Sequence, residues 1–212
     1  MDSLRQSKIR TRAIAITDIA IEKVPKIGFK GFTDKESEII QNLHKSLLRI
    51  VQKKCKQSKI NDYEYGIAIE IHSWKSIVIE GERGAVYLNK SPEAKSMIRN
   101  GYRNSVLYMH NHPSTGTFSA DDIKTFLANE SIFLMTAVGH DGSVYYIQKT
   151  YEVNVSQFMM DYALLAEEYK KSGYTNNNAT LAIKDMLKQG EKYGLIYGKG
   201  VNKNGRHGKG NL

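Results

Sequence analysis

Two histidines, His110 and His112, stand two positions apart at the end of the apolar run of residues 105–109. Such a run predicts a buried strand, and residues two apart in a strand point to the same side of the sheet. Both imidazoles can therefore be aimed at one point. Ten residues after His112, Asp122 supplies a carboxylate. Two imidazoles, one carboxylate and an open fourth position form the ligand set of a catalytic zinc site.

The segment between these ligands predicts how they meet. Pro113 ends the strand because proline has no amide proton for the ladder, and a loop of small residues follows. Ser119 then opens a helix as its N-cap, so Asp122 lies in the first turn and can return to the histidines. Capping alone also explains the Ser119-x-x-Asp122 pattern, and we expect it to serve as a cap as well. Two histidines on the inner side of a strand are nevertheless costly to bury without a partner, which a metal ion provides.

Hydrophobic periodicity predicts an α/β (α+β) fold in which a mixed sheet is flanked by helices. Thr33 and Glu36 have the spacing of a capping box and begin an amphipathic helix over residues 34–56. Further helices are predicted over residues 91–99, from Ser119, from about residue 154 and over residues 181–187. Strands are predicted over residues 66–71, 76–80, 84–88, 105–109, 132–138 and 143–147.

These elements divide the chain into four parts. Residues 1–32 form an N-terminal arm, which is either poorly packed or laid across the domain. Residues 33–150 form the domain with the candidate site, and residues 151–197 form a C-terminal helical extension. Residues 198–212 are rich in glycine, lysine and asparagine, a composition that predicts disorder.

The composition limits the possible functions. The chain has 212 residues, of which 41% are hydrophobic and 25% are charged, as in an ordinary globular protein. No apolar run reaches the roughly 20 residues of a membrane helix, and residues 1–6 lack the apolar core of a signal peptide. The single cysteine, Cys55, excludes an internal disulfide and a cysteine-based zinc site, and it predicts a reducing compartment.

The net charge of +9 suggests a nucleic-acid partner, but its distribution does not favour one. Residues 1–12 carry +3 and residues 198–212 carry +4, which leaves +2 for the rest of the chain. Charge concentrated in the tails is typical of solvated ends rather than of a recognition surface. Nucleic-acid binding therefore stays a weakly supported alternative. A zinc deaminase is excluded, because its Pro-Cys-x-x-Cys signature needs two cysteines.

The residues His110-x-His112-Pro113 and Ser119-x-x-Asp122 resemble the signature of the JAMM (MPN-plus, JAB-domain) zinc metallopeptidases. The sequence of residues 110–114, His-Asn-His-Pro-Ser, is similar to the motif of the RadC-like and prokaryotic JAB branch. The resemblance covers about residues 62–150. It implies the MPN/JAB (cytidine-deaminase-like) architecture. It also implies His110, His112 and Asp122 as zinc ligands, water as the fourth ligand, and Ser119 as a hydrogen-bond donor to the oxyanion.

The chain departs from the family pattern at one place. The spacer between His112 and Ser119 holds six residues, where the commonest family pattern has seven. With this shorter spacer, either Asp121 or Asp122 could be the third ligand. The Ser-x-x-Asp frame favours Asp122.

The same family uses an upstream glutamate as general acid/base, near the start of the first strand of the sheet. Glu64 fits this place, because it precedes the apolar residues 66–69. Glu70, Glu80 and Glu82 are alternatives. If Glu64 has no catalytic role, we expect it to be a solvent-facing acid at a strand edge.

The resemblance implies a zinc-dependent hydrolase of peptide or isopeptide bonds, acting on a protein or peptide substrate such as a ubiquitin-like tail. The alternative is a non-catalytic or RadC-like module in a DNA-associated, phage or toxin context. We expect a cytoplasmic protein without membrane association, or one released from a bacterial cell as part of a toxin or phage system. The remaining histidines of the body, His44, His72 and His140, are expected to have packing or surface roles.

Overall fold

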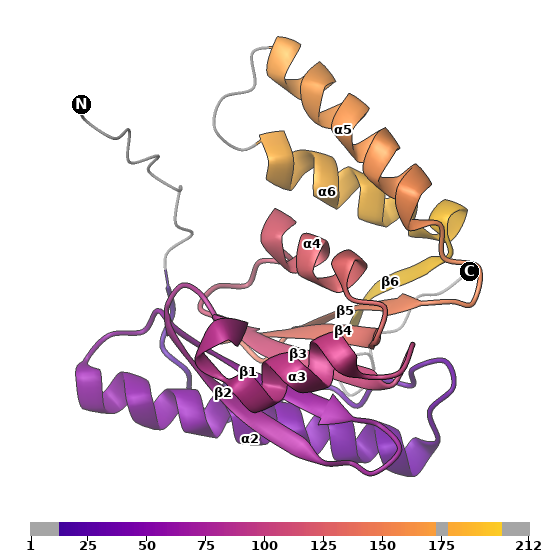
Figure 1. The fold of residues 1–212 in the computed structure, drawn as a ribbon. Helices are drawn as coiled ribbons and strands as arrows, with labels where there is room; N and C mark the ends of the chain where they lie inside the picture. The colour runs from indigo at the N-terminus through magenta and orange to yellow at the C-terminus, as the bar shows by residue number, and fades with distance from the viewer. Residues whose placement is uncertain (1–12, 173–177, 201–212) are drawn as a thin grey trace, which may run out of the picture.

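The computed structural model describes residues 13–172 and 178–200 (Figure 1). In these residues six strands form one sheet in the order β2-β1-β3-β4-β5-β6. The strands are β1 (Tyr63–Glu70), β2 (Ser76–Arg83), β3 (Val106–His112), β4 (Ile132–Gly139), β5 (Val144–Lys149) and β6 (Leu195–Gly200). β3 and β4 pair in parallel, whereas the other neighbouring strands pair antiparallel. The expected mixed sheet is therefore confirmed.

Helices cover both faces of the sheet (Figure 1). α1 (Asp18–Glu22) and α2 (Asp34–Ser58) lie on one face. On the other side lie α3 (Pro92–Asn100), α4 (Ala120–Ala128), α5 (Val155–Lys171) and α6 (Asn178–Lys188). Two hydrophobic cores result, because each face of the sheet packs on its own helices. Across the described ranges, no helix combines the length and the apolar character needed to cross a membrane.

α2 shows how a local signal determines where a helix begins. The Thr33 hydroxyl accepts a hydrogen bond from the Glu36 amide, and the Glu36 carboxylate accepts one from the Thr33 amide. The predicted capping box is thus present. One face of the helix buries Leu47, Leu48 and Val51 against the sheet. The helix was predicted to end near residue 56 and ends at Ser58.

The candidate ligands lie at the carboxyl end of β3. The chain leaves β3 at His112, forms α4 and returns through β4, which runs parallel to β3. In the register of these two strands, His110 is opposite Ala137 and His112 is opposite Gly139. The carboxyl end of β3 and the amino end of α4 are therefore adjacent, which is where strand-helix-strand units commonly bind ligands.

The described part of the N-terminal arm, residues 13–32, is well packed. Ile16, Ile21, Val24 and Phe29 are buried in the core shared with α2. The arm therefore lies across the domain, which is one of the two sequence predictions. The other, poor packing, is wrong for these residues, because α2 and the sheet offer an apolar surface that covers them.

The strand predicted over residues 84–88 does not form. Gly84 has a φ of +70°, and the Glu82 amide donates to the carbonyl of Ala85, so the chain turns at this point. A single bridge joins Glu82 and Ala85, and a short 3₁₀ helix, Leu88–Lys90, follows. The apolar run was misleading because a tight turn, rather than a partner strand, accounts for these backbone hydrogen bonds.

Residues 195–200 form β6, although a helical extension to 197 and a disordered tail from 198 were predicted. The glycines caused this error. A Cβ on Gly198 would lie 2.5 Å from the Tyr146 hydroxyl, and one on Gly200 would lie 2.5 Å from Ile27. These glycines allow close packing against neighbours rather than marking disorder. The predicted helices of the extension are present as α5 and α6, and residues 201–212 lie outside the described residues.

Candidate metal centre

His110, His112 and Asp122 come together in the structure. The two imidazoles lie on the same side of β3, with their Nε2 atoms 2.9 Å apart. Asp122, in the first turn of α4, places Oδ1 3.3 Å from Nε2 of His110 and Oδ2 3.4 Å from Nε2 of His112. Three metal-binding side chains with donor atoms this close form a candidate metal centre.

Ring stacking holds His110 in place. Its ring is stacked on that of Tyr108, with 5.6 Å between the centroids. Gly66 of β1 packs directly against Tyr108, because a Cβ at position 66 would lie only 3.1 Å from the tyrosine ring. His110 is buried, whereas the side chains of His112 and Asp122 are 12% and 21% exposed. The centre is therefore reached from the side of His112 and Asp122.

Ser119 caps α4 and orients Asp122 at the same time. The amide and the hydroxyl of Ser119 both donate to Oδ2 of Asp122, each at 2.7 Å. In return, the Asp122 amide donates to the Ser119 hydroxyl at 3.2 Å. The cap expected from the sequence is thus present. The second role expected of Ser119, donation to an oxyanion, stays a prediction.

The carboxylate of Asp122 stabilises positive charge on the imidazole beside it. Burial alone would raise the pKa of Asp122, but the imidazoles of His110 and His112 hold it well below its usual range. Burial alone would lower the pKa of His112, but the hydrogen bond and the charge of Asp122, with a contribution from Glu64, raise it to about 9. A charged carboxylate therefore has a positive charge beside it at neutral pH.

The outer contacts of the two imidazoles differ. Nδ1 of His112 lies 3.4 Å from the carbonyl of Gly116, which can only accept a hydrogen bond. This contact favours a proton on Nδ1, so Nε2 is the nitrogen that would give up its proton to bind a metal ion. Nδ1 of His110 is buried and has no hydrogen-bond partner among the described residues. The orientation of His110 therefore depends on ring packing and on the contacts of Nε2 with His112 and Asp122.

Glu64 lies on the same side of the sheet as the histidines. Gly66 is directly opposite His110 in the β1–β3 register, and Glu64 is two residues earlier on β1. The charge of Glu64 contributes to the raised pKa of His112, so the carboxylate is within electrostatic reach of the centre. The β1–β2 register shifts beside Glu64, a bulge of the kind often found next to functional sites.

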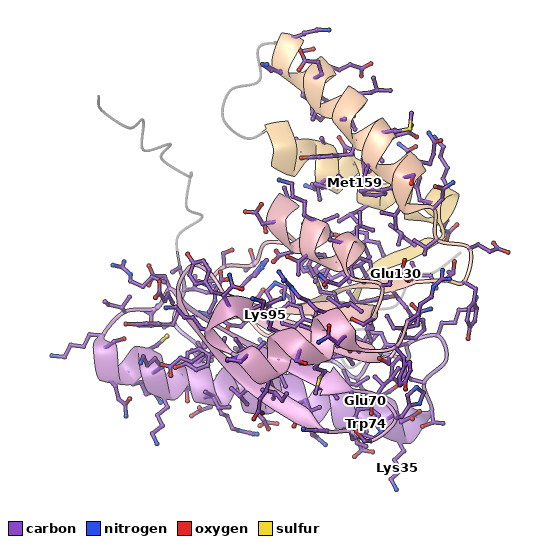
Figure 2. All side chains as sticks on the ribbon, in the orientation of Figure 1. Lys35, Glu70, Trp74, Lys95, Glu130 and Met159 are labelled. Atoms are coloured by element: carbon purple, nitrogen blue, oxygen red, sulfur yellow. The ribbon has the colours of Figure 1, made fainter. Side chains whose placement is uncertain are left out.

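The other candidate glutamates have different surroundings. Glu70 lies at the opposite end of β1 and accepts hydrogen bonds from Ser73, in the turn where Figure 2 labels Glu70 and Trp74. The remaining two each pair with a lysine: Glu80 with Lys54 and Glu82 with Lys90. Among the four glutamates considered from the sequence, Glu64 is thus the one that acts electrostatically on His112.

The other histidines of the described residues lie outside the centre. His44 of α2 is buried, with Nε2 2.7 Å from the hydroxyl of Thr136, and burial lowers its pKa to about 3. His140 is also buried, and its Nδ1 lies 2.8 Å from the carbonyl of Ile14. His72 is exposed in the β1–β2 turn. These positions fit the packing and surface roles expected from the sequence.

Both ends of the described chain reach the loop that follows β3. The Ile14 amide donates to the Pro113 carbonyl at 3.0 Å. The hydroxyls of Thr117 and Tyr197 are 2.9 Å apart. Sequence patterns did not indicate Ile14 or Tyr197, because each contact joins residues far apart in the chain and neither residue belongs to a recognisable motif.

Comparison of the chain with protein-family models, with curated proteins and with solved structures finds no match. What the centre can do therefore follows from its own residues. Two imidazoles and a carboxylate can bind a cation, and a second carboxylate, that of Glu64, lies within electrostatic reach. A surface hollow along β2 includes Tyr63 but none of the three ligands.

Proposed function

We propose that this chain is a zinc-dependent hydrolase of the JAMM (MPN-plus) type that cleaves peptide or isopeptide bonds. One observation carries the proposal: the Nε2 atoms of His110 and His112 are 2.9 Å apart, and each lies 3.3 or 3.4 Å from one of the two carboxylate oxygens of Asp122. One donor atom from each residue falls within 4.8 Å of the others. The ligands of a tetrahedral zinc ion, at bond lengths of about 2.0–2.1 Å, lie about 3.3 Å apart. The three side chains therefore need little movement to hold the ion.

The donor set favours zinc over harder cations. Calcium and magnesium prefer six or more oxygen ligands, whereas zinc accepts two imidazole nitrogens and one carboxylate oxygen in a four-coordinate site. Three protein ligands leave one position for water or substrate. A zinc ion bound there would lower the pKa of its water to about 7 and polarise a substrate carbonyl.

Glu64 is proposed as the general acid/base. Its place on the same side of the sheet as the histidines lets it take a proton from water at the centre and return it to the leaving amine. Glu70 lies at the other end of β1, and Glu80 and Glu82 pair with lysines. These surroundings support the choice of Glu64.

Ser119 is proposed as a hydrogen-bond donor to the developing oxyanion, a contribution worth roughly 3–4 kcal/mol in comparable sites. Its hydroxyl is directed to Asp122 in the structure. The hydroxyl must therefore rotate towards the substrate during the reaction. The amide of Ser119 can keep Asp122 oriented meanwhile, because it donates to the same carboxylate oxygen.

The proposal extends to architecture and substrate. A mixed sheet between two helical layers, with ligands at the end of β3 and the start of α4, supports an MPN/JAB architecture. We propose a protein or peptide substrate, with a ubiquitin-like tail as one candidate. The proposed setting is the cytoplasm, or a bacterial toxin or phage system.

Metal analysis tests the zinc site. The full chain, purified without chelator, should contain about one zinc ion per molecule. His112→Ala should lose the metal, because it removes one of three ligands. His72→Ala, which changes an exposed histidine outside the centre, should keep it. A wild-type protein without zinc would reject the site.

Cleavage of peptides and of ubiquitin-like fusions tests catalysis separately. Glu64→Gln should retain zinc and lose activity by about 10²- to 10⁴-fold. Glu70→Gln, the matched change at the other end of β1, should remain active. Full activity of Glu64→Gln would reject the proposed base. A zinc-loaded protein that cleaves none of these substrates would favour the alternative, a non-catalytic or RadC-like module in a DNA-associated, phage or toxin context.

A further inference from the structure

Asn111 stands between the two histidines in sequence, and its side chain lies on the opposite face of β3. It is fully buried. Its Oδ1 accepts a hydrogen bond from the Tyr65 amide at 2.7 Å, and its Nδ2 donates to the Tyr63 carbonyl at 2.9 Å. Nδ2 also lies 2.9 Å from Nε2 of His140. The side chain thus joins three parts of the molecule.

These partners determine the orientation of the amide and the tautomer of His140. The Tyr65 amide can only donate and the Tyr63 carbonyl can only accept, so the oxygen and nitrogen of Asn111 cannot be exchanged. Nδ1 of His140 must carry a proton to bond to the Ile14 carbonyl, which leaves Nε2 to accept from Asn111. A chain of hydrogen bonds therefore runs from the N-terminal arm to β1.

The two β1 groups bound by Asn111 lie on either side of Glu64. The β1–β3 register extends from Glu70 to Gly66, and the Asn111 amide binds the β1 backbone beyond that point. Asn111 itself is flanked by His110 and His112. One buried amide therefore connects the backbone around the proposed base to the backbone around two proposed ligands.

We propose that Asn111, supported by His140, is a positioning residue that sets the separation between Glu64 and the metal ligands. Neither side chain touches the reacting atoms, because Asn111 points to the opposite face and acts through the β1 backbone. The hydrogen bonds of Asn111 to the Tyr65 amide and the Tyr63 carbonyl are called here the clamp on β1. The catalytic consequence rests on the proposed function, whereas the clamp does not. A displacement of about 1 Å in a catalytic group can lower a rate about 100-fold.

Hydrogen exchange of the Tyr65 amide, followed by NMR in the full chain, tests the clamp without any activity. In Asn111→Ala this amide should exchange about tenfold faster than in the wild type, because it loses its acceptor. Thr136→Val is the matched control, since it removes another buried side-chain hydrogen bond, that to His44. It should leave the protection of Tyr65 unchanged.

A second variant covers the case in which Asn111→Ala does not fold. Asn111→Leu keeps the approximate shape of the side chain but offers neither an acceptor to the Tyr65 amide nor a donor to the Tyr63 carbonyl, so exchange of the Tyr65 amide should accelerate as well. Unchanged protection of Tyr65 in the variant that folds would overturn the clamp.

Kinetics and metal content then test positioning. Asn111→Ala should keep its zinc and its KM and lose about 100-fold in kcat, whereas Thr136→Val should keep kcat. A kcat loss no larger than that of Thr136→Val overturns the positioning role, whatever the exchange result. If Glu64→Gln is as active as the wild type, the proposed function fails, while exchange of the Tyr65 amide still decides the clamp.

Discussion

α2 and α4 begin with the same capping box, yet only the box of α4 belongs to the candidate centre. At α2 the amide and hydroxyl of Thr33 donate to Glu36 at 2.7 and 2.8 Å. At α4 the amide and hydroxyl of Ser119 both donate to Asp122 at 2.7 Å. The return bond to the hydroxyl is 3.2 Å in both boxes. Local geometry therefore does not distinguish them.

The two carboxylates differ in what else they meet. Hydrogen bonds from Thr33 lower the pKa of Glu36, and they come from the cap itself. Asp122 also contacts two imidazoles of β3, which hold its pKa low against the effect of burial. A capping carboxylate thus becomes a metal-ligand candidate only when the fold places metal-binding side chains beside it.

The largest effect, a loss of zinc affinity, is expected from neutralising the capping carboxylate of α4 but not that of α2. Asp122→Asn keeps an oxygen for the cap but removes a charged ligand, so zinc affinity should fall at least about 100-fold, and activity with it. Glu36→Gln, the same change at the other cap, should keep both. Competition with a chromogenic chelator measures the affinity. Equal affinities in the two variants would remove the distinction between the boxes.

The next effect concerns His44, the buried histidine on α2. Burial lowers its pKa to about 3 from 6.5, so between these values the unfolded chain binds a proton that the folded chain does not. The free energy of unfolding is therefore highest above pH 6.5 and decreases as the pH falls, by about 2 kcal/mol at pH 5 from this residue. Urea unfolding at pH 7.5 and 5.0 measures it.

His44→Gln provides the control for this pH dependence. The variant should lose about 2 kcal/mol less than the wild type between the two pH values. Any contribution from His140, whose pKa is also lowered by burial, remains in both proteins and cancels. The same pH dependence in wild type and variant would show that His44 accepts a proton in the folded state.

A smaller effect is expected from the capping hydroxyls. Thr33→Ala and Ser119→Ala should each lower the free energy of unfolding by about 1 kcal/mol, because each removes an N-cap. Ser119→Ala should also weaken zinc binding about tenfold, since its hydroxyl orients a ligand. Thermal unfolding and zinc titration separate the two effects. Weaker zinc binding in Thr33→Ala would instead point to a general loss of stability.

The smallest effect is expected at Asp121, the neighbour of the proposed ligand. Asp121 is exposed and forms an ion pair with Lys124 on the helix surface, at 3.6 Å. Asp121→Asn should leave stability and zinc affinity nearly unchanged, because exposed ion pairs contribute little. Zinc titration of this variant checks the choice of aspartate, and a large loss of affinity would reverse it.

The candidate centre could be predicted from the sequence because its signals are local. The alternation of a strand places His110 and His112 on one side, and the cap spacing places Asp122 in the first turn of a helix. The same kind of signal predicted α2 from Thr33 and Glu36. The identity of the metal and the role of Glu64 stay predictions, because the first rests on the general chemistry of the donor set and the second on resemblance.

What the sequence could not show depends on partners that are distant in the chain. Gly198 looks like part of a loose tail until Tyr146 is placed against it. Residues 13–32 look loose until α2 covers their apolar side chains. The hydrogen bonds of Asn111 to β1 span 46 and 48 positions, and no local pattern predicts such a pairing.

The contacts of the loop after β3 form at different times during synthesis. The ligands leave the ribosome well before Tyr197, whose hydroxyl meets Thr117 across 80 positions of sequence. β6 and its pairing with β5 cannot exist until that last segment has emerged. A chain that is still being translated thus carries all the ligands but not the final support of the loop. The contact between Thr117 and Tyr197 is added only after residue 197 has been made.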